Sequence, residues 1–169
     1  MSEIDLSKLK EPFRPEELEW RIQQSGKSNG RIWALVVPYV QSRAIMERFD
    51  EVCGPENWRV HYRETSRGYL GHLEVKLGGE WIGKEDGADL TNIEPTKGGI
   101  SGALKRAAVL WGVGRYLYAI PVGFAQIYDY NAKVDGQDLQ KGVVKDDNGR
   151  VSDRFKWLPP KLPAWALPQ

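Results

Sequence analysis

Alternation of apolar and polar residues predicts an antiparallel sheet near the middle of the chain. Three short segments alternate or are bounded by glycine-containing turns: Trp58–Thr65, Tyr69–Leu77 and Glu80–Lys84. A period of two is typical of strands with one buried face, and short turns join such strands in antiparallel order. The sequence therefore predicts a three-stranded meander.

The segments before the meander predict a strand and helices. The apolar, β-branched segment Arg31–Val40 predicts a strand whose end, at Pro38, lies at an edge or bulge. Apolar residues at helical spacing predict a helix from Ser42 to Val52. Pro15 and the two glutamates after it predict a short helix that runs through Ile22, followed by a loop over Gln23–Gly30.

After the meander, Thr96–Ala119 predicts a long helix that packs across the sheet. At 100° a residue, its apolar side chains form one stripe about 120° wide, which suits packing on a sheet. The members of this stripe are Ile100, Ala103, Leu104, Ala107, Leu110 and Trp111. The expected fold class is α+β, an antiparallel β-meander packed against a long α-helix in a β-β-β-α core.

A length of 169 residues suits one domain with a sizeable core. We expect a flexible N-terminal lead-in over residues 1–11 and the main domain over residues 12–128. Residues 129–169 form a polar and then Pro/Trp-rich tail, expected to be extended, with Trp157 and Trp165 as anchors.

Charge is unevenly distributed, although the formal net charge is only +1. The segment Glu80–Glu94 has five acidic residues and one lysine. Between Pro95 and Tyr128 there is no acidic residue, and the predicted helix carries four cations, at Lys97, Lys105, Arg106 and Arg115. Uncompensated positive charge on one helix predicts a site for a polyanion such as nucleic acid.

A second face of the helix combines cations with small residues, at Lys97, Ser101, Lys105, Ala108, Gly112 and Arg115. Small side chains allow a sugar-phosphate chain to approach, and the cations neutralise phosphates, so that binding weakens with salt. Arg106 lies about 100° round from Lys105 and faces elsewhere. Arg43, in the first turn of the earlier helix, adds its charge to free backbone amides.

Other interpretations of these residues stay open. The cations of the long helix also fit a solvated helix face. Glu74-Val75-Lys76, with Asp50 or Asp86 as a second carboxylate, resembles half of a metal-dependent nuclease signature, although ordinary strand alternation explains it better.

Several classes of site and segment are excluded by the sequence. One cysteine and two histidines exclude a multi-cysteine zinc site and an intrachain disulfide. The N-terminal residues include acidic side chains and no long apolar run, so we expect neither a signal peptide nor a membrane span there, and we expect a cytoplasmic protein. No motif calls for a metal or nucleotide cofactor.

These residues resemble the single-strand annealing proteins of the Rad-fifty-two/Rad-twenty-two type. The most specific part is KGGISGALKR with Gly112, which is similar to the family's Lys-x-x-x-Ser/Thr-x-Gly-Leu-Lys-Arg helix. The bacterial and phage branch adds the sequence GVGRYLY, present here from Gly112 to Tyr118. Weaker matches are YVQSR, GPENW and GKEDG.

The resemblance implies a ring of identical chains with single-stranded DNA in a groove. Residues at the positions of Arg43, Lys97, Lys105 and Arg106 line that groove in the family. The implied function is annealing of complementary strands in DNA double-strand break repair and homologous recombination, without ATP, in a bacterial or phage-infected cell. Other recombination or replication proteins are further expected partners. The alternatives are a metal-dependent nuclease and a ring module that binds no DNA.

Overall fold

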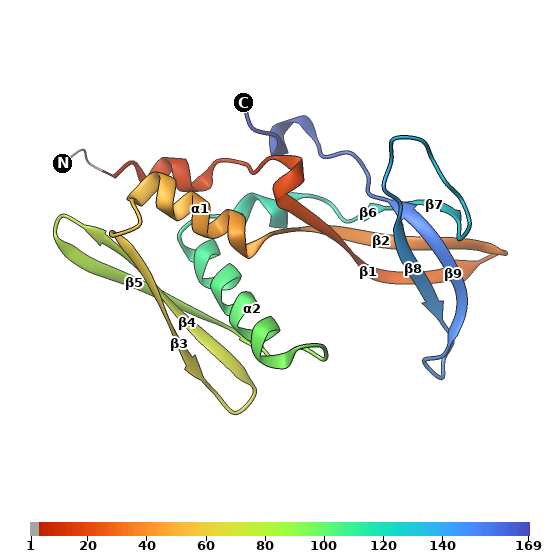
Figure 1. The fold of residues 1–169 in the computed structure, drawn as a ribbon, viewed down its shortest axis with the longest axis horizontal. Coiled ribbons are helices and arrows are strands. Elements are labelled where there is room, and N and C mark those ends of the chain that lie inside the picture. Colours follow the sequence, from red (N-terminus) through yellow and green to blue (C-terminus); the bar gives the residue numbers. More distant parts are fainter. Residues whose placement is uncertain (1–3) are drawn as a thin grey trace. The chain divides into compact units, whose positions relative to one another are not determined.

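The computed structural model describes residues 4–169, which fold into two compact units (Figure 1). Unit 1 contains the chain up to Leu18, Val40–Ala119 and Ala164–Gln169. Unit 2 contains Glu19–Tyr39 and Ile120–Pro163. The first three residues of the predicted N-terminal lead-in lie outside the described part of the chain.

The sheet of unit 1 is the predicted meander. Its strands β3 (Trp58–Glu64), β4 (Gly68–Leu77) and β5 (Glu80–Asp89) are antiparallel in the order β3-β4-β5. A two-residue turn, Gly78-Gly79, joins β4 to β5, and both glycines have positive φ, which this kind of hairpin turn requires. β5 is longer than predicted, because regular pairing with β4 continues to Asp89.

Two helices belong to unit 1. α1 (Ser42–Cys53) is confirmed almost residue for residue. α2 (Pro95–Leu110) packs against β4 and β5 (Figure 1), and its predicted apolar stripe is mostly buried. The prediction that this helix reaches Ala119 is wrong. Gly112 adopts φ +95, a left-handed conformation that ends helices, and the chain continues as the 3₁₀ helix η3 (Arg115–Ala119).

Small residues let α2 approach the sheet closely. A Cβ on Gly71 of β4 would lie 3.1 Å from the carbonyl oxygen of Ala103, and one on Gly102 would lie 2.8 Å from Cβ of Ala88. A Cβ on Gly99 would lie 2.8 Å from the ring of Tyr69. Larger side chains here would push helix and sheet apart, so these positions fix the height of α2 above the sheet.

The N-terminal segment is more ordered than predicted. The 3₁₀ helix η1 (Leu6–Lys10) carries Leu9, which is fully buried, so the described part of the lead-in is attached to unit 1. The helix predicted from Pro15 through Ile22 is wrong, because only the 3₁₀ helix η2 (Pro15–Glu17) forms before a strand begins. A last 3₁₀ helix, η4 (Ala164–Ala166), also belongs to unit 1.

Unit 2 consists of two three-stranded sheets. One has the order β1-β2-β6, with β1 (Leu18–Ser28), β2 (Arg31–Val40) and β6 (Gly123–Phe124). The other has the order β7-β9-β8, with β7 (Gln126–Asp129), β8 (Gln140–Lys145) and β9 (Val151–Leu158). β2 is confirmed, whereas the predicted loop over Gln23–Gly30 is wrong, since most of it lies in β1.

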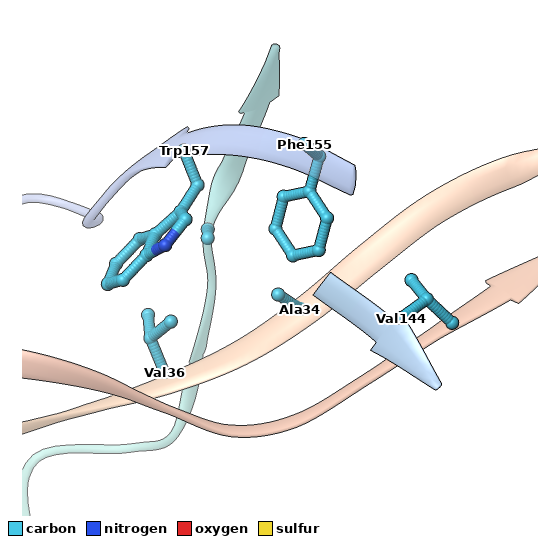
Figure 2. Packing of buried hydrophobic residues seen from close by; sticks show 6 residues of the cluster. Ala34, Val36, Val144, Phe155 and Trp157 are labelled. Carbon is cyan, nitrogen blue, oxygen red and sulfur yellow. The ribbon is translucent and has the colours of Figure 1, made fainter. Parts of the chain in front are cut away.

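The core of unit 2 lies between these sheets (Figure 2). Ala34 and Val36 of β2 point toward Val144 of β8 and toward Phe155 and Trp157 of β9. The tail was therefore predicted wrongly as an extended segment, because two of its segments pair as strands. Trp157 is a core residue, not a surface anchor, and Trp165 is exposed.

The aromatic core predicts that two phenylalanines of unit 2 contribute very differently to stability. Phe155 is 1% exposed and Phe124 is 67% exposed. We expect Phe155→Ala to lower the free energy of unfolding by about 3–5 kcal/mol, because it leaves a cavity. Phe124→Ala removes the same atoms from a solvated position and should cost less than about 1 kcal/mol. Urea unfolding of both variants measures this; equal losses would contradict the assignment of the core.

Candidate nucleic-acid interface

A row of polar side chains follows one face of α2. Lys97, Ser101 and Lys105 are spaced four residues apart, so they lie on the same side of the helix along about 12 Å. Lys97 is exposed, and its Nζ lies 3.2 Å from a carboxylate oxygen of Glu94 at the start of the helix. Lys105 is half-buried. The exposed ion pair between Lys97 and Glu94 contributes little to stability, so Lys97 can readily exchange Glu94 for a phosphate.

A contact between two serines brings the start of α1 to this row. The hydroxyl oxygens of Ser42 and Ser101 lie 2.6 Å apart. Arg43 follows Ser42 directly, is exposed, and forms no hydrogen bond or ion pair with any described residue. No side chain caps the first turn of α1, so its backbone amides add partial positive charge beside Arg43. The structure thus brings together four of the six predicted residues: Arg43, Lys97, Ser101 and Lys105.

Arg106 lies apart from this row. Its Nε is 3.2 Å from a carboxylate oxygen of Asp86 on β5, and its side chain is about half-exposed. It lines an open hollow of about 420 Å³ that also includes residues at the start of β4 and the end of β5. The prediction that Arg106 faces away from Lys105 agrees with this position. Asp86 partly neutralises the arginine, which lowers its attraction for a second anion.

Arg115 closes the C-terminal end of α2. Its guanidinium donates hydrogen bonds to the carbonyl oxygens of Val109, at 2.7 and 3.0 Å, and of Leu110, at 3.0 Å. Lys84 of β5 donates to the same Leu110 carbonyl at 2.9 Å. These carbonyls carry the negative end of the helix dipole, and the carbonyl of Val109 also accepts a hydrogen bond from the backbone N–H of Gly112 at 2.9 Å. Both cations therefore act on the helix end in this structure.

The predicted lane of small residues is not open to a ligand. Ala108 is fully buried, and Gly112 is buried against the side chain of Lys10, whose Cγ would lie 2.8 Å from a Cβ at position 112. These residues are small because protein atoms pack on them. The expectation that a sugar-phosphate chain approaches α2 along Ala108 and Gly112 is therefore wrong, and the accessible part of the face is its N-terminal half.

The opposite face of the sheet carries a network of charged side chains. Arg59 donates to Glu74 at 2.5 Å, and His61 and His72, a cross-strand pair, lie 3.5 and 3.8 Å from the carboxylate of Glu74. The hydrogen bond from Arg59 holds the pKa of Glu74 below its ordinary value. The sequence signal of the network is the alternation of these residues along β3 and β4.

The carboxylates considered for a nuclease site have separate neighbours. Glu74 is bound to Arg59, Asp50 accepts a hydrogen bond from Trp58, and Asp86 faces Arg106. Within residues 4–169, no three His, Cys, Asp or Glu side chains are grouped as ligands for a metal ion. In the same part of the chain, no helix is both long and apolar enough to span a membrane.

Comparison with known proteins places this arrangement in a family. The model of the Rad52/22 family of double-strand break repair proteins matches residues 3–70 and 68–135. The chain belongs to this family. The matched region includes α1, the meander and α2, so the serine contact and the cationic row lie within the part that the family shares.

Two curated relatives are both named single-stranded DNA-binding protein DdrA. The protein from Deinococcus radiodurans is 28% identical over 163 residues, and the one from Deinococcus deserti is 30% identical over 168 residues. Each alignment covers 95% of this chain, but only 66% and 69% of the respective relatives. No solved structure matches the chain.

The capping role of Arg115 predicts an effect on stability. We expect Arg115→Ala to lower the free energy of unfolding by about 1 kcal/mol, because two helix-end carbonyls lose a charged donor. Arg67→Ala is the control, since Arg67 forms an exposed ion pair with Asp89 and should have almost no effect. Thermal or urea unfolding measures both. Unchanged stability of the Arg115 variant would contradict the role in capping.

The contact between Arg59 and Glu74 predicts a pH-dependent contribution to stability. Because the pKa of Glu74 is lowered in the folded state, the contribution is complete above the ordinary glutamate pKa of 4.5 and is lost as pH falls below it. Arg59→Ala should therefore destabilise the protein at pH 7, and the difference from the unmodified protein should shrink toward pH 3. Urea unfolding across this range tests the prediction; a difference that is constant with pH contradicts it.

Proposed function

We propose that this protein binds single-stranded DNA through Arg43, Lys97, Ser101 and Lys105 and anneals complementary strands in double-strand break repair. The observation that carries the proposal is the contact of Ser42 with Ser101, which brings an exposed arginine and an uncapped helix start to the lysines of α2. Membership of the family and the names of the two relatives support DNA as the polyanion.

The proposed mechanism is neutralisation of phosphate charge. Two complementary strands repel each other as polyanions, and each phosphate held by a lysine or arginine reduces that repulsion and releases a counterion. Long cationic side chains reach the backbone without covering base edges, so the bases stay available for pairing. Neither step calls for ATP or a metal ion.

The proposal includes assembly of the chain into a ring. One cationic row contacts only a few nucleotides, but several copies side by side hold one strand at a high effective concentration. Within the DNA-binding domain proposed over residues 12–128, Arg106 acts from another side of α2, about 100° round from Lys105. We expect it to contribute less than Lys97, because Asp86 already faces its guanidinium.

A salt titration tests the DNA interface. We expect Lys97→Ala and Lys105→Ala to weaken the binding of a single-stranded oligonucleotide. Each variant should also lower the slope of log affinity against log salt by about 0.7 for every phosphate that is no longer neutralised. Lys76→Ala is the matched control, because Lys76 lies on the face of the sheet turned away from α2 and should leave both quantities unchanged. Fluorescence anisotropy measures affinity.

The same variants separate annealing from the nuclease alternative. Annealing of complementary oligonucleotides should proceed without ATP and in the presence of a chelator, and it should slow in the Lys97 and Lys105 variants. A nuclease would instead cleave DNA only with a divalent cation and lose activity in Glu74→Ala or Lys76→Ala. Unchanged affinity and salt slope in both α2 variants would overturn the proposed interface.

A further inference from the structure

The two outer strands of the meander are open edges. β3 and β5 flank β4, and within residues 4–169 neither strand pairs with another strand on its outer side (Figure 1). The closing pair Leu77–Glu80 of a two-residue turn faces inward, so alternate residues of β5 from Trp81 to Asp89 direct their N–H and C=O groups outward. The same alternation holds for β3, starting from the hydrogen bond between Thr65 and Gly68. The backbone N–H and C=O groups directed outward from β3 are those of Trp58, Val60, Tyr62 and Glu64.

The edge of β5 lacks the features that usually prevent strand pairing. It is ten residues long, contains no proline, and pairs with β4 without a register shift. Its only lysine, Lys84, is directed to the end of α2, where its Nζ lies 2.9 Å from the Leu110 carbonyl oxygen and 4.6 Å from the centre of the Trp111 ring. An edge of this kind is a template for another strand.

Charge indicates which strand fits each edge. β5 contains four acidic residues and one lysine, whereas β3 contains two arginines and one glutamate. Pairing of two β5 edges would place acidic residues against acidic residues, and pairing of two β3 edges would place arginine near arginine. Pairing of β5 with β3 brings opposite charges together. Within one copy, Arg63 of β3 already reaches Glu85 of β5 at 3.4 Å across one face of the sheet.

Exposed apolar side chains fit the same arrangement. Ile82 of β5 is 44% exposed and Tyr62 of β3 is 36% exposed. Both side chains lie on the face of the sheet against which α2 packs. Tyr62 pairs with Gly71, which contacts α2, and Ile82 pairs with Val75, which lies on the same face of β4 as Gly71. If β5 of one copy lay beside β3 of another, Ile82 and Tyr62 would both be covered at the junction of the two sheets.

We infer that β5 of one copy pairs with β3 of the next copy, so that the three-stranded sheets of neighbouring copies join edge to edge. β3 and β5 are both antiparallel to β4 and hence parallel to each other, so the new pair is parallel when the sheets continue in the same sense. The interface uses two different edges and is therefore heterologous, and an interface of this kind forms a ring when the rotation between neighbouring copies closes. This inference rests on the ring of the proposed function and names the surfaces that form it.

Crosslinking between two single-cysteine variants tests the pairing. Tyr62→Cys and Ile82→Cys are co-expressed with separate affinity tags and treated with a flexible bis-maleimide. We expect covalent dimers that carry both tags, and none when either variant is treated alone. Cys53 gives little background, because it is buried and burial raises its pKa to about 11.

A charge placed at the edge provides a second measurement. Ile82→Lys should shift the mass in solution from the oligomer toward the monomer, because a lysine on an edge strand opposes pairing. Val151→Lys is the matched control, since Val151 is 46% exposed in unit 2, and it should leave the mass unchanged.

The outcomes separate this inference from the proposed function. Crosslinks within a single-variant sample, an oligomer without mixed-tag dimers, or an Ile82→Lys protein with unchanged mass would each overturn the pairing of β5 with β3. None of these results bears on the salt titration of Lys97 and Lys105. If mixed-tag dimers form and those lysine variants bind DNA normally, the edge pairing stands and the proposed DNA interface fails.

Discussion

The close contact between α2 and its sheet is the constraint on which the rest of unit 1 depends. Gly71, Gly99 and Gly102 remove the side chains that would separate the two layers. Because α2 lies so near β4 and β5, Trp111 Nε1 reaches the carbonyl oxygen of Leu73 at 3.1 Å, and Arg106 reaches Asp86. A helix held at this height also presents Ser101 to Ser42, and the position of Arg43 follows from that contact.

The two faces of α2 serve different purposes. Its apolar stripe and its small residues are used for packing, and this includes Ala108 and Gly112, which looked from the sequence like part of a ligand surface. Its cationic side chains also have different neighbours. Arg115 satisfies carbonyl groups at the helix end, Arg106 faces an acidic strand, and the row of Lys97 and Lys105 is joined by Arg43. The positive charge of the proposed interface thus lies along the face of α2 that carries Lys97 and Lys105.

The parts of the fold that could be predicted are those set by local patterns. The meander follows from alternation and glycine turns, and α1 follows from apolar residues at helical spacing. Gln23–Ser28 was predicted wrongly because it is polar and becomes a strand only by pairing with β2. The hairpin of β8 and β9 was missed for a similar reason: Phe155 and Trp157 are buried by Ala34 and Val36, more than 100 residues earlier in the chain. The contact between Ser42 and Ser101 leaves no signal in a single sequence.

The construction of unit 2 from two distant chain segments has a consequence for folding during synthesis. β1 and β2 leave the ribosome more than 80 residues before β6 and the strands that bury Ala34 and Val36. During that interval the hairpin shows its apolar face to water, while all the residues of α1, the meander and α2 are already made. Pairing over such sequence separation is slow, so the helices and the meander of unit 1 are expected to fold first and unit 2 to close only when the C-terminal strands arrive. The last segment of unit 1, Ala164–Gln169, is made after those strands and is added at the end.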